Sequence, residues 1–118
     1  MFCYTLNMKD YTITELSQAV KKSFANYDNQ GTQHWTWEIA AQDLAYQIGS
    51  LNKVMLQLSG HRWADDKDKA ALETDFRNEL ADILAEILYI ADERGINMNI
   101  AMKEMIADDH RKVAERTE

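Results

Sequence analysis

The stretch DKDKAALETDFRNELADILAEILYIADER, residues 66–94, decides the fold of this 118-residue chain. Apolar side chains recur along it every three or four residues, which is the spacing of one face of an α-helix. The stripe stops just before Gly95, and glycine commonly follows the last turn of a helix because it adopts a positive φ without strain. We therefore predict one long helix over residues 66–94. Its stripe consists of Leu72, Phe76, Leu80, Ile83, Ile87 and Ile90.

Two helices are expected before this one. Thr12 and Glu15 have the spacing of a capping box, which predicts a helix over residues 13–27. A second apolar stripe ends at Gly60 and predicts a helix over residues 36–59. Residues 1–11 are expected to form a flexible or loosely packed N-terminal segment.

A fourth helix is expected to follow the long one, with Asn97 or Asn99 as its cap. The chain contains no proline and only four glycines, so little interrupts its helices and few tight turns are available for a sheet. Its length suits a single domain over residues 1–118. We predict an all-α fold, an antiparallel bundle of about four helices.

Oligomerisation is expected to complete this bundle. Leu84, Leu88 and Ala91 form a second apolar face on the long helix. A helix that is apolar on two sides in so small a domain is typical of a subunit interface. The expected assembly is a homodimer or a homotetramer.

Targeting signals and membrane spans are not evident. The only cysteine, Cys3, excludes an intramolecular disulfide and fits a reducing compartment. The first eight residues lack the basic and apolar regions of a signal peptide, and no apolar run is long enough for a membrane span. We expect a cytoplasmic protein without a membrane partner.

The charge of the chain restricts its partners. The net charge is −7, and residues 65–93 contain ten acidic against three basic residues. Affinity for a nucleic-acid polymer comes from Lys and Arg that neutralise its phosphates, so such a partner is not expected. A free nucleotide remains possible when a divalent cation supplies the positive charge.

The acidic residues of the long helix include a candidate metal site. Glu79 and Asp82 are three residues apart and share one helix face, and Glu86 lies on the same side of the apolar stripe. Carboxylates that flank a core repel one another unless a cation such as Mg²⁺ or Mn²⁺ joins them. The alternative is a solvated face paired with Arg77 and the lysines.

Three segments together resemble the MazG-like all-α nucleoside triphosphate pyrophosphohydrolases. They are LAYQIGSL at residues 44–51, ELADIL at residues 79–84 and ADERGIN at residues 91–97, followed by a final helix with a basic tip. The similarity covers about residues 35–116. It implies hydrolysis of a nucleoside triphosphate to the monophosphate and pyrophosphate, with Mg²⁺ or Mn²⁺ held by an ExxE pair on one helix and an ExxD pair on the next.

The chain departs from the family pattern at its first acidic pair. Glu79 and Asp82 match the second pair, whereas the first falls on Gln47 and Ser50, which carry no charge. Lys53 stands where family members often have a further acid. Half of the acidic motif is therefore missing, and neutral ligands hold Mg²⁺ more weakly than carboxylates do.

One hypothesis is that the site has moved by one helical turn. In an antiparallel pair, a step back from Gln47 to Asp43 runs in the same direction as a step forward from Asp82 to Glu86. A cation would then be held by Asp43, Asp82 and Glu86, with Gln47 as a neutral ligand. In the alternative, Asp43 and Glu86 point to solvent or pair with lysines.

Other candidate substrate contacts have structural alternatives. Trp37, within a cluster that includes His34, Trp35 and Tyr46, could stack on a nucleobase, although such clusters often staple a helix entry. On the last helix, Lys103 and Asp109 align approximately with residues that meet phosphate in the family. Arg111 could also contact phosphate, or compensate the helix C-terminus.

Two functions therefore remain open from the sequence. The first is a metal-dependent pyrophosphohydrolase that acts on non-canonical or surplus nucleoside triphosphates. The second is a catalytically silent bundle that binds a nucleotide or a protein partner. The resemblance favours the first, while Gln47, Ser50 and Lys53 favour the second.

Overall fold

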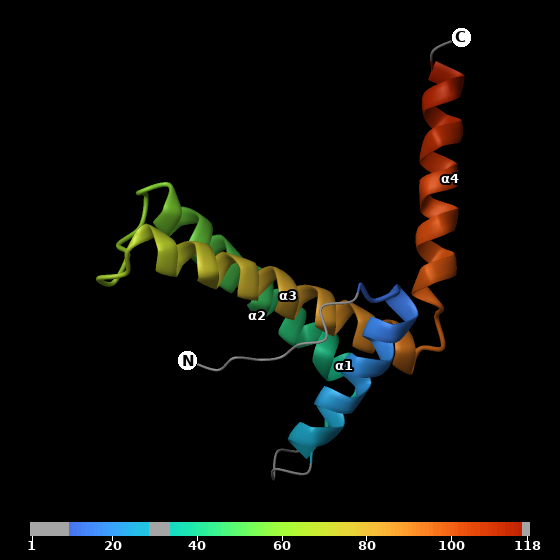
Figure 1. Cartoon of the computed structure of the whole chain (residues 1–118), viewed down its shortest axis with the longest axis horizontal. Coiled ribbons are helices and arrows are strands. Elements are labelled where there is room, and N and C mark those ends of the chain that lie inside the picture. Colours follow the sequence, from blue (N-terminus) through green and yellow to red (C-terminus); the bar gives the residue numbers. More distant parts are fainter. Residues whose placement is uncertain (1–9, 29–33, 117–118) are drawn as a thin grey trace.

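A computed structural model describes residues 10–28 and 34–116 of the chain (Figure 1). These residues form four helices: α1 (Ile13–Asp28), α2 (Trp37–Leu58), α3 (Lys69–Glu93) and α4 (Met98–Arg116). The described part contains no strand, so the prediction of an all-α fold with four helices is confirmed. The expected N-terminal segment lies mostly outside the described residues. None of the described helices is long and apolar enough to span a membrane.

The helix starts follow from side-chain caps. Thr12 and Glu15 form the expected capping box, with N–H to oxygen distances of 3.0 and 3.1 Å. Asp68 caps α3 by accepting a hydrogen bond of 2.8 Å from the Ala71 N–H. The helix therefore begins three residues later than expected, because Asp65 and Asp66 adopt φ values of 54° and 65°, which no α-helix accommodates. Of the two proposed caps of α4, Asn97 accepts from the Ile100 N–H.

Both expected glycine stops are present. Gly60 and Gly95 have φ values of 78° and 69°, and each follows the C-cap residue of its helix, Ser59 after α2 and Arg94 after α3. After α3, the Ile96 N–H donates to the Ala91 carbonyl and the Gly95 N–H donates to the Asp92 carbonyl. This pattern is a Schellman motif, which satisfies carbonyls at the end of the helix.

An antiparallel hairpin of α2 and α3 forms the body of the molecule, and α1 packs against the C-terminal half of α3 (Figure 1). Phe24 of α1 stacks on Tyr89 of α3 with ring centroids 4.2 Å apart. The Tyr89 hydroxyl donates a hydrogen bond of 2.6 Å to the Trp35 carbonyl and so ties the entry of α2 to α3. These contacts join three helices at one end of the hairpin.

The second apolar face of α3 is divided between the chain and solvent. Leu88 and Ala91 are buried within the chain, so these two do not provide the expected subunit interface. The helix α1 packs against this part of α3. The periodicity of α3 alone did not reveal that contact. Leu84, one turn before Leu88, remains exposed.

The last helix projects away from the other three (Figure 1). Among the described elements α4 packs mainly against α1, near the point where it leaves α3. The radius of gyration is 17.8 Å, compared with about 13.5 Å for a compact domain of this length. The single chain is thus extended, with a small core and much of its apolar surface open.

Candidate cation site between α2 and α3

Two carboxylates of α3 have an oxygen that is buried without a hydrogen-bond partner. They are Glu79 Oε2 and Glu86 Oε2. Glu86 is 5 % exposed, Glu79 is half-buried, and Asp82 between them is exposed. An ionised carboxylate buried in this way is costly, so such a group binds a proton or a cation.

Asp43 of α2 lies directly against Glu86. The two carboxyl groups are close enough for Asp43 to act directly on the protonation of Glu86. Asp43 Oδ2 also accepts a hydrogen bond of 3.3 Å from Gln47 Nε2, one turn further along α2. Asp43, Gln47 and Ser50 are all half-buried, as expected for one face of α2 that is turned towards α3. The structure therefore brings together the two acids that define the shifted site.

The environment of Glu86 favours its protonated form. Burial, the hydrogen bond and charge of Asp43, and the charge of Asp82 raise the pKa of Glu86 to about 8. With a pKa of about 8, Glu86 is mainly protonated at neutral pH when no cation is bound. Burial, followed by the charges of Asp82 and Asp75, also raises the pKa of Glu79.

The donor set is smaller than the one expected. Among the described residues, no group of three or more His, Cys, Asp and Glu side chains is arranged to hold a metal ion. Glu79 lies two helical turns, or about 10 Å, from Glu86, and Asp82 is on the exposed side of α3. The four acids of the expected site are therefore not assembled around one point. Asp43 and Glu86 lie together, whereas Glu79 and Asp82 lie apart from them.

The residues present nevertheless fit a hard cation. Mg²⁺ and Mn²⁺ prefer carboxylate and amide oxygens and retain several waters, so one or two protein carboxylates suffice. Asp43 and Glu86 supply the charge, the unpartnered Glu86 Oε2 supplies a free ligand atom, and Gln47 supplies an amide. Rotation of that amide would direct its oxygen to the ion.

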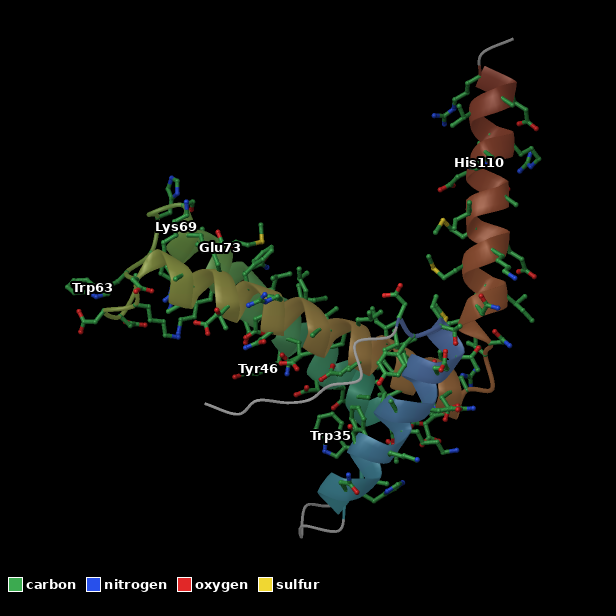
Figure 2. The ribbon with its side chains drawn as sticks, viewed as in Figure 1. Trp35, Tyr46, Trp63, Lys69, Glu73 and His110 are labelled. Atoms are coloured by element: carbon green, nitrogen blue, oxygen red, sulfur yellow. The ribbon has the colours of Figure 1, made fainter. Side chains whose placement is uncertain are left out.

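The expected phosphate contacts of the last helix lie elsewhere. Lys103, Asp109 and Arg111 belong to α4, which extends away from the α2/α3 hairpin. Figure 2 shows the separation between His110 on α4 and Tyr46 on α2. Within α4, Arg111 forms ion pairs of 2.6 and 2.7 Å with Asp108 and Glu115. These residues therefore do not join the Asp43–Glu86 pair within one chain.

The aromatic cluster at the start of α2 is mainly structural. The Trp35 ring packs tilted against Phe24 with centroids 5.8 Å apart. The Trp37 ring lies under the Arg94 guanidinium, 5.0 Å from its centroid. Tyr46 is 69 % exposed and precedes Gln47 on α2. Unlike the half-buried Trp35 and Trp37, Tyr46 is therefore open to a ligand from solvent.

One buried polar contact escaped the sequence analysis. Gln57 is buried and its Nε2 donates a hydrogen bond of 3.0 Å to the Trp63 carbonyl, which shapes the loop between α2 and α3. Trp63 itself is 80 % exposed at the tip of the hairpin (Figure 2). The available signal was a glutamine between Leu56 and Leu58, since a buried amide needs a partner.

Comparisons with protein-family models, curated proteins and solved structures find no match to this chain.

Proposed function

We propose that the protein is a divalent-cation-dependent nucleoside triphosphate pyrophosphohydrolase whose metal site lies between Asp43 and Glu86. The observation that carries the proposal is the contact between these two carboxyl groups, one of which has a buried oxygen without a partner. The reaction class comes from the resemblance of residues 35–116 to the MazG-like family. The acid pair lies one turn from the position that this family uses, on the same face of the hairpin.

The residues divide the work as follows. Asp43 and Glu86 bind the ion, and Gln47 orients Asp43 through its hydrogen bond. A bound Mg²⁺ or Mn²⁺ would neutralise the phosphates and lower the pKa of a coordinated water. Glu79 and Asp82 lie further along α3, where they extend the acidic surface beside the triphosphate. Water adds at the α-phosphorus, and the bond from that phosphorus to the oxygen that bridges to the β-phosphorus breaks. Pyrophosphate is the leaving group, the nucleoside monophosphate keeps the oxygen of the water, and the released proton passes to solvent.

A pyrophosphate-release assay tests this activity. The panel contains canonical and modified nucleoside triphosphates with Mg²⁺ or Mn²⁺. We expect release by the intact protein and a fall of about 100-fold or more in Asp43→Asn/Glu86→Gln, because loss of even an outer-shell partner of a metal costs about 10–100-fold. Glu73→Gln, an exposed acid on α3, is the matched control and should retain activity.

A second function is favoured by a specific observation. Gln47 already donates to Asp43, and Glu86 is mainly protonated at neutral pH, so the pair is satisfied in part without a cation. Such an arrangement suits a catalytically silent bundle that binds a nucleotide or a protein partner. Absence of pyrophosphate release over the whole panel, with nucleotide binding retained, would support this function instead.

A further inference from the structure

An apolar stripe runs along one side of α4 and is exposed over most of its length. Taking about 100° per residue, Met98, Met102, Met105, Ile106 and Val113 lie within one side of the helix. The first two are half-buried near α1, whereas the last three are exposed. Beyond its first turns, α4 therefore presents an apolar face to solvent.

The α2/α3 hairpin has an apolar edge of its own. Ile48 and Met55 of α2 and Leu80 and Leu84 of α3 are each between 45 and 50 % exposed. Asp43 and Glu86 mark the sides of α2 and α3 that face each other. At about 100° per residue, the four apolar residues lie together on one side of the hairpin and are turned away from the acid pair. We call these four residues the apolar edge.

The exposed surface is larger than that of a compact monomer of the same mass. The chain exposes 9525 Å², whereas a compact monomer of 13.7 kDa exposes about 6,600 Å². The difference is about 2,900 Å² per chain, and obligate dimers bury about 2,000–5,000 Å² in total. An interface with a second copy is therefore of the right size to cover it.

We propose that α4 of one copy lies along the apolar edge of a second copy, antiparallel to its α3, and that the second copy reciprocates. The two contacts are related by a twofold axis, so the exposed face of α4 in each copy is covered by the apolar edge of the other. This assembly does not depend on the catalytic proposal. Its docking surfaces are the apolar stripe of α4 in one copy and the apolar edge in the other.

Charge complementarity sets the register of this contact. Asp109 lies within the apolar stripe of α4, and Arg77 lies one turn before Leu80 beside the apolar edge. Both are exposed, and no ion pair among the described residues involves either of them. Buried against an apolar surface, Asp109 needs a cation, which Arg77 of the second copy supplies.

The same register matches the apolar side chains. With Asp109 opposite Arg77 in an antiparallel pair, Ile106 falls opposite Leu80 and Met102 opposite Leu84. Val113 falls opposite Glu73. Because Asp43 contacts Glu86 in the α2/α3 hairpin, Met55 lies at about the level of Thr74 and therefore beside Val113. The register set by the Asp109–Arg77 ion pair thus places Met102, Ile106 and Val113 each beside an apolar side chain of the second copy.

The α4 of the same chain cannot reach this register. The link between α3 and α4 contains only residues 94–97, so a helix folded back on its own α3 places Met98 opposite Glu93. Asp109 then falls at the level of Asp82, about 8 Å along the axis from Arg77. The ion pair with Arg77 cannot form in that arrangement, which favours exchange between copies.

Light scattering and sedimentation on the full chain test the docking surface. We expect a dimer, and Ile106→Glu should raise its dissociation constant at least about 10-fold, since it places an unpaired charge in an apolar contact that the dimer buries. Asp109→Lys and Arg77→Asp should each weaken the dimer at least about 10-fold, and the double variant should restore it. Glu104→Lys, on the opposite side of α4, is the matched control and should not change it.

Disulfide trapping distinguishes docking of α4 on a second copy from docking of α4 on its own chain. In a Cys3→Ser background, a mixture of chains with Ile106→Cys and chains with Leu80→Cys should oxidise to a heterodimer. A monomeric parent chain would overturn the proposal. So would a dimer that tolerates Ile106→Glu and forms no mixed disulfide, or an intrachain disulfide in the double-cysteine monomer. Helical circular dichroism of each variant shows that it remains folded.

Discussion

Replacement of Glu86 by Gln is expected to stabilise the protein at pH 8.5 and to leave its stability nearly unchanged at pH 5. The pKa of Glu86 is raised to about 8 in the folded state, so the folded protein binds more protons than the unfolded chain between about pH 4.5 and 8. The free energy of unfolding therefore falls as pH rises through this window. A glutamine amide can donate to Asp43 at every pH and removes the loss.

The expected difference between the two proteins at pH 8.5 is about 2 kcal/mol. The full pKa shift of Glu86, at about 1.4 kcal/mol per unit, would give a larger difference in the free energy of unfolding. Solvent screening at half-buried Asp43 reduces that difference. Urea unfolding in EDTA at several pH values measures the difference. Glu73→Gln makes the same charge change on an exposed part of α3 and is the control. Identical pH profiles for Glu86→Gln and Glu73→Gln would contradict the buried acid pair.

Mg²⁺ or Mn²⁺ is expected to raise the melting temperature of the EDTA-treated protein more strongly at pH 8 than at pH 6. A ligand at one hundred times its dissociation constant stabilises the folded state by about 2.7 kcal/mol. For a domain of this size, each kcal/mol raises the melting temperature by about 4–8 °C. At pH 6 the ion must displace the proton of Glu86, so the effect is smaller.

Thermal scans over a range of ion concentrations measure this stabilisation. Asp43→Asn should abolish most of it, whereas Glu73→Gln should not. Ca²⁺ may be substituted for Mg²⁺ in the same scans, because it accepts longer ligand distances. Equal stabilisation of the parent and Asp43→Asn would place the bound ion elsewhere on the acidic surface.

The elements and their ends were largely predictable because their causes are local. Gly60 and Gly95 stop their helices through a backbone conformation that favours glycine, and Thr12 and Glu15 cap each other over three residues. The start of α3 was placed too early because Asp66 and Asp68 are equally good caps by residue type. Only the positive φ of Asp66 excludes it from the helix.

The tertiary contacts were harder to predict because they depend on helix direction. The meeting of Asp43 and Glu86 followed from helical spacing once α2 and α3 were taken as antiparallel neighbours. Burial of Leu88 requires α1 to pack at that level of α3, and periodicity within α3 carries no such information. The direction of α4 is set by its short link to α3, and so the separation of Lys103 from the acid pair was not foreseen.

Direct counting of bound Mn²⁺ by electron paramagnetic resonance tests the central claim, which is that Asp43 and Glu86 together hold one divalent cation. Titration of the protein at pH 8 is expected to show one ion per chain that is lost in Asp43→Asn/Glu86→Gln and retained in Glu73→Gln. Mg²⁺ should displace it. No bound Mn²⁺ in the parent protein, or the same stoichiometry in Asp43→Asn/Glu86→Gln, would contradict the claim.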